Sequence, residues 1–413
     1  MSKNRVNDWL GARDGWRWAW GLALAYAAGL AVAAWALGAG RVLTWAGAPH
    51  MGLAFSDLHV IAAARAELAA GGDPYASNPG DPWGRVYNYP SVWMKAWPIE
   101  PATVAAWGVA LGVAWLATVG AWWGRLSRGQ GVVAGLLLAA PPVVLALERA
   151  NNDLVIFMLL AGALACLARG WGEVAAGLAW AGFALKLYPL AGMVALVRLG
   201  WRRACLVGGV VLLLAGAYVW AQWDEVGRVL GNTPADTSMA YGATVGPRVL
   251  AEWLTRETGR RHDVTALLPH ARVWAAVLAV LALAHGWRAA EAVRRAGGPE
   301  RAQSRALDGF RAAAGIYAAT FVLGANYDYR LIFWLLAVPW LTRGAEAGEA
   351  RAEARARRAA LGGVIALMWA NPWWGGGFAV VRELAAWGLL VMACWWLGRT
   401  LPARARSGAG AIG

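Results

Sequence analysis

Ionisable side chains in this chain gather where apolar segments end, and their types suit one kind of chemistry. The places are Asp57, the segment ERANND at 148–153, Lys186 with Tyr188, and NYDYR at 326–330. Charged groups at membrane depth are costly, so they are functional by default. A phosphate leaving group needs cations to stabilise its charge, while the attacking hydroxyl needs one carboxylate base. The mixture therefore favours transfer from a lipid phosphate over glycoside hydrolysis, which usually needs two facing carboxylates.

Asp57 is the candidate base. It lies near the start of a polar stretch, 55–89, between the first two apolar segments. Ser56 is predicted to be the N-cap of a helix over 57–70, which Gly71 and Gly72 would end. The partial positive charge of the first helical turn favours an ionised carboxylate, the state that a general base needs. The alternative interpretation is that Asp57 only caps the helix.

The candidate substrate-binding residues are spread over the later segments: Arg149, Asn152, Asp153, Lys186, Tyr188, Asp328 and Arg330. Each has a simpler structural explanation. Arg149 could form an interfacial ion pair with Glu148, and residues 151–153 could cap the helix that follows. Asp328 could pair with Arg330, and Lys186 could extend toward lipid headgroups.

A metal site is not favoured. His59 would leave the helix on a different face from Asp57, and the other histidines, His50, His262, His270 and His285, have no ligand-like spacing. The acidic residues of the first polar stretch are too dispersed for a carboxylate cage. Three cysteines, Cys166, Cys205 and Cys394, stand singly, so neither a metal site nor a disulfide framework is indicated.

Membrane helices are the elements that must position these residues. The chain is 59% hydrophobic and 15% charged, which is typical of an all-α polytopic membrane protein. Its net charge of +14 comes from arginines in short loops, as the positive-inside rule expects, and not from a basic face for nucleic acid. Many of the 29 tryptophans lie near segment edges and predict an aromatic belt: Trp16, Trp18, Trp20, Trp122, Trp123, Trp373, Trp374, Trp395 and Trp396.

Apolar segments long enough to cross a hydrocarbon core of about 30 Å recur along the chain. The candidates are 17–39, 102–124, 130–147, 154–168, 204–221, 271–287, 307–324, 329–342, 359–373 and 378–397. A single span over 174–198 would place Arg198, Arg202 and Arg203 opposite the other basic loops. We therefore predict a re-entrant hairpin, with arms 174–185 and 190–200 and with Lys186, Tyr188 and Pro189 at its tip.

This topology places both termini in the cytoplasm and all the candidate residues on the outer face. The chain then forms one membrane domain over 1–400, with outer loops at 41–101 and 222–269. The tail, 401–413, is predicted to be disordered and cytoplasmic. The topology was derived from lysine and arginine alone, so the gathering of the candidate residues on one face supports an outward-facing site.

At these residues the chain resembles glycosyltransferase family 87, the DUF2029-type polyprenyl-phosphate-dependent mannosyltransferases and their relatives in the GT-C superfamily. The resemblance covers about residues 50–342 and rests on FSDLHV followed by GGDPY, on ALERANNDLVIFMLLAGAL, on the AGFALKLYPL hairpin and on NYDYRLIF. It implies a GT-C fold with about ten to twelve transmembrane segments and a long first outward loop.

The resemblance also implies inverting sugar transfer without metal or other cofactor, in bacterial cell-envelope biosynthesis at the plasma membrane. The catalytic aspartate of the family carries over to Asp57, and its Asn-Asp and Lys-Tyr-Pro segments to Asn152 with Asp153 and to Lys186, Tyr188 and Pro189. Some mannosyltransferase members place a histidine near the late outer turn, where this chain has Asn326 to Arg330. A different class, a transporter or flippase for lipid-linked sugars, could line a path with the same charges. A transporter more often shows an internal repeat and a site at the midplane, and we see no such repeat.

Overall fold

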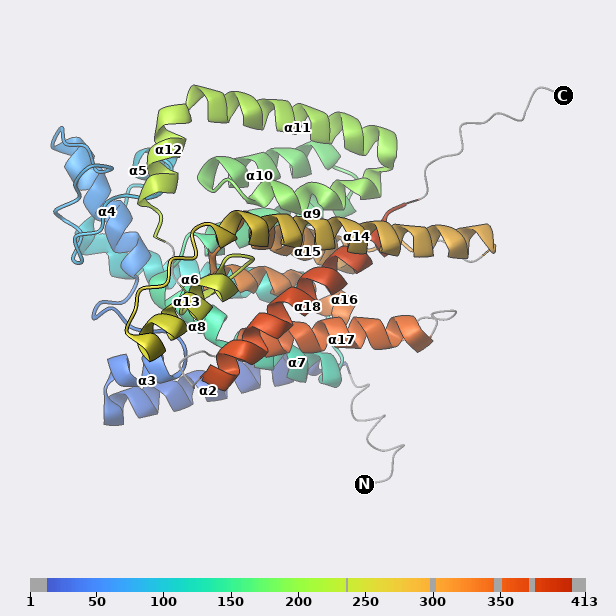
Figure 1. Cartoon of the computed structure of the whole chain (residues 1–413), viewed down its shortest axis with the longest axis horizontal. Coiled ribbons are helices and arrows are strands. Elements are labelled where there is room, and N and C mark those ends of the chain that lie inside the picture. Colours follow the sequence, from blue (N-terminus) through green and yellow to red (C-terminus); the bar gives the residue numbers. More distant parts are fainter. Residues whose placement is uncertain (1–12, 235–236, 298–301, 345–350, 371–375, 403–413) are drawn as a thin grey trace.

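The computed structural model describes residues 13–234, 237–297, 302–344, 351–370 and 376–402, which form a bundle of helices (Figure 1). Its long helices are α2 (Gly15–Leu37), α6 (Val104–Trp123), α11 (Trp201–Ala221), α14 (Leu267–Arg295), α15 (Arg305–Leu323), α17 (Arg351–Trp369) and α18 (Gly376–Thr400). The shorter membrane-region elements are α7 (Arg128–Leu138), α8 (Pro141–Arg149), α9 (Asp153–Ala168), α10 (Gly172–Leu185), η2 (Pro189–Leu199), η3 (Asp328–Leu336) and α16 (Val338–Leu341). The all-α prediction is confirmed. The tail was predicted over 401–413, and residues 403–413 of it lie outside the described part of the chain.

Six helices of the described residues are long and apolar enough to cross a membrane, and a bent pair makes a possible seventh. The chain is therefore a multi-pass membrane-embedded protein. The segment 154–168, predicted as a full span, is the shorter helix α9 of 16 residues, and the predicted hairpin arms α10 and η2 have 14 and 11 residues. The predicted segment 329–342 is two pieces, η3 and α16. These pieces are buried by neighbouring helices, which explains their apolar composition without a crossing of their own.

The predicted straight segment 130–147 is the bent pair α7 and α8, whose axes meet at 54°. Pro141 and Pro142 start the second helix, and the residue before them, Ala140, is extended with φ −69° and ψ 147°. A proline ring disfavours the helical conformation of the preceding residue, so the sequence AAPP stops α7 and restarts the chain in a new direction. The bend directs the C-terminal end of α8 toward the first polar stretch.

The predicted hairpin forms. Its arms, α10 and η2, lie antiparallel, because Gly172 at the start of α10 faces Leu199 at the end of η2, and Gly182 faces Pro189 at the tip. The second arm is a 3₁₀-helix, which is tighter than an α-helix and rises about 2.0 Å per residue. The hairpin packs between α9, α15 and α11. Its tip, which carries Lys186 and Tyr188, lies against α5, because the indole of Trp93 on α5 donates to the carbonyl of Leu185 at 3.0 Å. Helices α4 and α5 lie at one end of the bundle (Figure 1).

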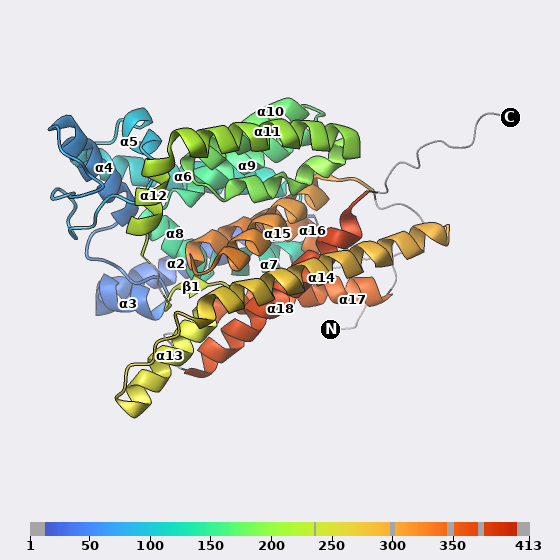
Figure 2. The ribbon, with the colours of Figure 1, turned by 45° about the horizontal axis from the view of Figure 1, so that its top comes forward.

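Small residues let several helices approach closely. A Cβ on Gly131 of α7 would lie 1.9 Å from the carbonyl oxygen of Gly15 on α2. In the same way, a Cβ on Gly286 of α14 would lie 2.0 Å from the carbonyl oxygen of Trp395 on α18. Helices α14 and α18 pack along each other (Figure 2). Close packing of this kind is a common way to join helices inside lipid, where the hydrophobic effect between helices is weak.

The predicted outer loops, 41–101 and 222–269, are largely helical, and their elements lie at the end of the bundle that holds the candidate residues. They are α3 (Ala39–Trp45), α4 (Ser56–Ala69), α5 (Val92–Ala96), η1 (Pro101–Thr103), α12 (Trp223–Asn232) and α13 (Val245–Thr258). Two short strands, β1 (Ala240–Tyr241) and β2 (Asn326–Tyr327), pair antiparallel. This pairing joins the long second loop to the NYDYR turn.

The predicted aromatic belt is partly wrong. Trp122, Trp123 and Trp396 are buried, and the indoles of the first two donate hydrogen bonds to the carbonyls of Leu336 and Leu335. Trp16 and Trp18 are exposed as predicted, whereas Trp373 and Trp374 lie outside the described residues. At the same end of the bundle as α4 and α13, the exposed indoles include Trp35, Trp45, Trp220, Trp223 and Trp253, which mark an interface that the pattern of segment edges did not identify.

Candidate active site

Asp57 lies in the first turn of α4, as predicted, and it is buried, with 5% of its surface exposed. The predicted cap is wrong: the N-cap residue is Phe55, and Ser56 is the first helical residue. Neither residue caps the helix with its side chain. The carboxylate of Asp57 points instead at groups from other segments, so the structure contradicts the interpretation that it serves only as a cap.

The Asp57 carboxylate has two partners. The side-chain amide of Asn151 donates to its Oδ2 at 2.5 Å, and the guanidinium of Arg85 lies 3.7 Å from its Oδ1. Arg85 is itself held by Asp81, to which it donates at 2.8 and 3.1 Å, and it donates to the carbonyl of Ser56 at 2.6 Å. Burial lowers the pKa of Arg85, but the Asp81 hydrogen bonds and the Asp57 charge outweigh it and raise the pKa overall. A permanent positive charge thus faces the candidate base.

The ERANND turn is built from backbone in an unusual conformation. Ala150 has φ 46° and ψ 49°, and Phe55 has φ 64° and ψ 39°. These are the two described residues other than glycine with positive φ, and each costs about 1–3 kcal/mol. The amide N–H of Phe55 donates to the carbonyl of Glu148 at 2.7 Å, which joins the two strained segments. Strain is therefore concentrated where Asp57 meets Asn151.

A second cluster surrounds Asp153 at the start of α9. Lys186 donates to its Oδ1 at 2.5 Å and the Tyr188 hydroxyl donates to the same oxygen at 2.6 Å. Arg330 lies 3.9 Å from Oδ2, with its guanidinium 4.6 Å from the centre of the Tyr188 ring. Lys186 is buried, with 8% of its surface exposed. The hairpin tip, α9 and the late turn therefore meet around one carboxylate.

Asn151 connects the two clusters. Its Nδ2 donates to Asp57, while its Oδ1 accepts from Lys186 at 3.3 Å and from the backbone N–H of Asp153 at 2.9 Å. The combined network contains three carboxylates and three cations: Asp57, Asp81, Asp153, Arg85, Lys186 and Arg330. Balanced charge with shared hydrogen bonds makes such burial tolerable, because an unpaired buried charge is strongly destabilising. The carboxylate-rich end lies at Asp57 and the cation-rich end at Arg330.

Aromatic rings line the cation-rich end. The ammonium of Lys186 lies 5.6 Å from the Tyr89 ring centre and 5.3 Å from that of Tyr329, within the range of cation–π attraction. Burial raises the pKa of Tyr89 and of Tyr87 well above the ordinary value, so both phenols stay neutral. Burial also lowers the pKa of His59, which packs edge-on against Trp83 outside the network.

The remaining predicted residues take other partners. Glu148 pairs with His50 at 2.8 Å and not with Arg149, so the expected Glu148–Arg149 pair is wrong. Asp328 contacts Arg382 of α18, and Arg330 contacts Asn326. These contacts fix the late turn from both sides.

Two of the predicted substrate-binding residues stand beside the network. Asn152 is 1% exposed, and neither end of its amide has a partner among the described residues. The Nε of Arg149 is likewise buried without a partner within the described ranges. Asn152 does not cap α9 with its side chain, so the predicted capping role falls to Asn151.

The sequence reasoning missed Arg85, Asp81 and Asn151 as site residues. Asp81 and Arg85 stand four positions apart in a stretch without regular structure, and this spacing is a weak signal outside a helix. Asn151 was grouped with the ERANND segment and its capping alternative but was not assigned to the site, although an amide can donate to one group and accept from another. Among the described residues, no three His, Cys, Asp or Glu side chains gather as a metal site would require.

Comparisons with protein-family profiles, with curated proteins and with solved structures find no match to this chain. The fold and the site by themselves define the chain as a helical multi-pass membrane protein with a buried ionic network at one end of its bundle.

Proposed function

We propose that the chain is an integral membrane glycosyltransferase that transfers a sugar, mannose or another hexose or pentose, from a polyprenyl phosphate to a lipid or glycan acceptor. Transfer proceeds with inversion and without a metal. The observation that carries this proposal is the pairing of a buried carboxylate, Asp57, with a cation-rich end at Lys186 and Arg330, linked through Asn151. Transfer from a phosphate leaving group requires these two parts, a carboxylate base for the attacking hydroxyl and cations for the phosphate charge.

Asp57 is the base in this mechanism. It removes the proton of the acceptor hydroxyl as that oxygen attacks the anomeric carbon, and the bond from that carbon to the phosphate oxygen breaks on the opposite side. The electron pair stays on the phosphate, whose new charge the cations stabilise. Arg85 and Asn151 hold the Asp57 carboxylate in place through one oxygen each.

Arg330 is the principal phosphate ligand. Its contact with Asp153 is long, at 3.9 Å, and 18% of its side chain is exposed, whereas Lys186 is held at 2.5 Å by Asp153. Lys186 therefore contributes charge at a fixed position, and the Tyr188 hydroxyl orients Asp153 through the same carboxylate oxygen. The amide of Asn152 and the Nε of Arg149, which have no hydrogen-bond partner in the described part of the chain, provide further donors beside the network.

The same proposal includes a GT-C fold with about ten to twelve spans, which the family resemblance implies. It also includes the α10–η2 hairpin as re-entrant and the site on the periplasmic face of the bacterial plasma membrane, both of which follow from the positions of lysine and arginine. The second candidate is a transporter or flippase for lipid-linked sugars. The grouping of the network with α4 and α5 at one end of the bundle favours the enzyme, because a transport site lies near the midplane.

Sugar transfer by the purified protein in nanodiscs tests the proposal, with a panel of polyprenyl-phosphate sugars and a membrane extract as acceptor. Asp57→Asn is expected to lower transfer by about 10²- to 10⁴-fold, the usual contribution of a general base. The matched control is Asp73→Asn, the same change at an exposed aspartate of the same stretch that pairs with Arg228, and it should keep wild-type rates. Full transfer activity in Asp57→Asn would exclude Asp57 as the general base. Movement of a lipid-linked sugar across vesicles without transfer would favour the transporter.

A further inference from the structure

An open apolar groove of about 200 Å³ lies between the second hairpin arm, η2, and α11. Its η2 wall includes Leu190, Met193 and Val197, and its α11 wall includes Ala204, Cys205 and Gly208. None of its lining side chains is charged. The groove follows η2 for about 14 Å, at a rise of about 2.0 Å per residue from Leu190 to Val197.

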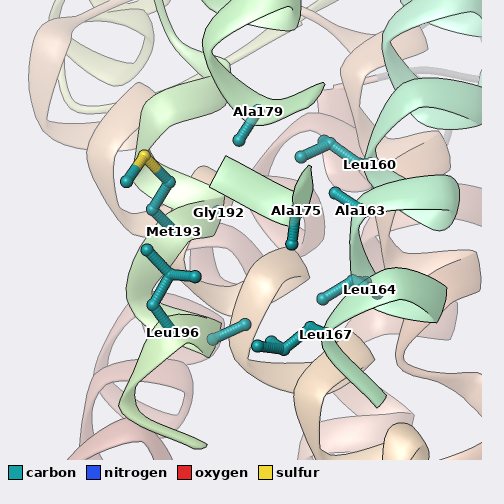
Figure 3. Close-up of a pocket in the computed structure, with 10 residues that line it drawn as sticks. Leu160, Ala163, Leu164, Leu167, Ala175, Ala179, Gly192, Met193 and Leu196 are labelled. Atoms are coloured by element: carbon teal, nitrogen blue, oxygen red, sulfur yellow. The ribbon is translucent and has the colours of Figure 1, made fainter. Parts of the chain in front are cut away.

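Small residues on α11 create this groove. Ala204, Cys205 and Gly208 stand where larger side chains would fill the space, and a Cβ built on Gly208 would meet nothing within 4 Å. The other face of η2 is packed differently. There, Gly192 and Ala195 line a cavity of only about 20 Å³ together with side chains of α9 and α10, and Met193 and Leu196 lie between this cavity and the groove (Figure 3). One face of η2 is thus closed against protein, and the other is open.

One end of the groove, at Leu190, is close in sequence to the hairpin tip that enters the candidate active site. Leu190 follows Tyr188 by two residues and Lys186 by four, and both of these side chains bind Asp153. An apolar groove with one end two residues along the chain from a cation-rich cluster matches a ligand with an anionic head and a long apolar chain. In lipid, the hydrophobic effect does not favour such a chain in the groove over the bilayer, so close packing and the head group must provide the preference.

We propose that this groove binds the prenyl chain of the lipid-linked donor, with the phosphate directed toward Lys186 and Arg330. The inference rests on the proposed function. A prenyl chain carries a methyl branch on each unit, and a wall of small side chains leaves room for these branches. The competing occupant is an ordinary anionic phospholipid with its head group at Arg202, the exposed arginine next to the other end of the groove.

Cys205 provides a direct measurement of occupancy that does not depend on transfer. It is the exposed one of the three cysteines, since Cys166 is half-buried and Cys394 is buried. In nanodiscs, polyprenyl phosphate is expected to slow the modification of Cys205 by N-ethylmaleimide several-fold. Mass spectrometry measures the rate of this modification. The same amount of anionic phospholipid should leave the rate unchanged. Equal protection by both lipids, or by neither, would overturn the proposal.

A substitution that fills the groove gives the second test. Gly208→Leu is expected to raise KM for a long-chain donor about tenfold, a loss of about 1.4 kcal/mol, and to leave KM for a short-chain donor unchanged. The control is Gly216→Leu on the same helix, where a Cβ also meets nothing within 4 Å but the groove is absent. Equal KM values for the long-chain donor in both variants would overturn the proposal that the groove binds the prenyl chain. Cys205 protection without transfer from any donor would overturn the proposed function and keep the groove.

Discussion

At the scale of single residues, the strained turn before Asn151 can be tested by removing one methyl group. Ala150→Gly relieves a left-handed conformation that costs about 1–2 kcal/mol, which offsets the lost methyl burial of about 0.8 kcal/mol and the greater freedom of the unfolded chain. Its unfolding temperature should stay near that of the wild type. Ala146→Gly, in the regular part of α8, has no strain to relieve and should lose about 2 kcal/mol. Thermal unfolding in detergent compares the two. A large loss in Ala150→Gly would show that the turn is not strained.

The residue types of the site could be predicted better than their partners. Ionisable side chains at the ends of apolar segments are costly, which identified Asp57, Asp153, Lys186 and Arg330 from the sequence alone. The partner of each charge depends on which segments meet in space. Glu148 therefore pairs with His50, far along the chain, and not with the adjacent Arg149. No sequence spacing could indicate that contact.

At the scale of elements, close contacts between helices make the effect of an added methyl depend on position. Gly131→Ala would place a Cβ 1.9 Å from the Gly15 carbonyl oxygen, so α2 and α7 must separate, at a cost of about 1–3 kcal/mol. Gly21→Ala, on the open face of α2, should be neutral or stabilise by about 0.4–1 kcal/mol. Thermal unfolding of both variants measures the two changes in stability, a loss for Gly131→Ala and no loss for Gly21→Ala. Equal stability would mean that α2 does not dock on α7 as described.

Element positions followed from apolar composition, but their shapes did not. The hairpin was predicted because basic residues must stay on one side, and the antiparallel arms confirm the hairpin itself. The 3₁₀ form of η2 has no comparable signal, because hydrophobic periodicity is too coarse over 11 residues. The bend between α7 and α8 was readable in Pro141 and Pro142, which the span prediction did not weigh against the length of the apolar segment.

At the scale of the whole molecule, the two ends of the bundle carry different charge arrangements. The Asp57 network lies at one end, with α4 and α5 (Figure 1). The opposite end holds arginines paired with scattered acids, including Arg128 with Asp14, Arg203 with Glu173, and Arg198 with the buried Asp308. The positive-inside rule assigns the arginine-rich end to the cytoplasm. The proposed reaction then draws its donor from the outer leaflet.

Cysteine labelling in intact cells tests this orientation. In a variant without the three native cysteines, Ser77→Cys in the first loop should react with a membrane-impermeant maleimide added outside. Arg355→Cys, an exposed position on α17, should react only after permeabilisation. The reverse pattern would place the Asp57 network in the cytoplasm, where the donor would have to come from the inner leaflet. Because both cysteines occupy exposed positions of the same chain, a difference in labelling reports the side of the membrane and not burial.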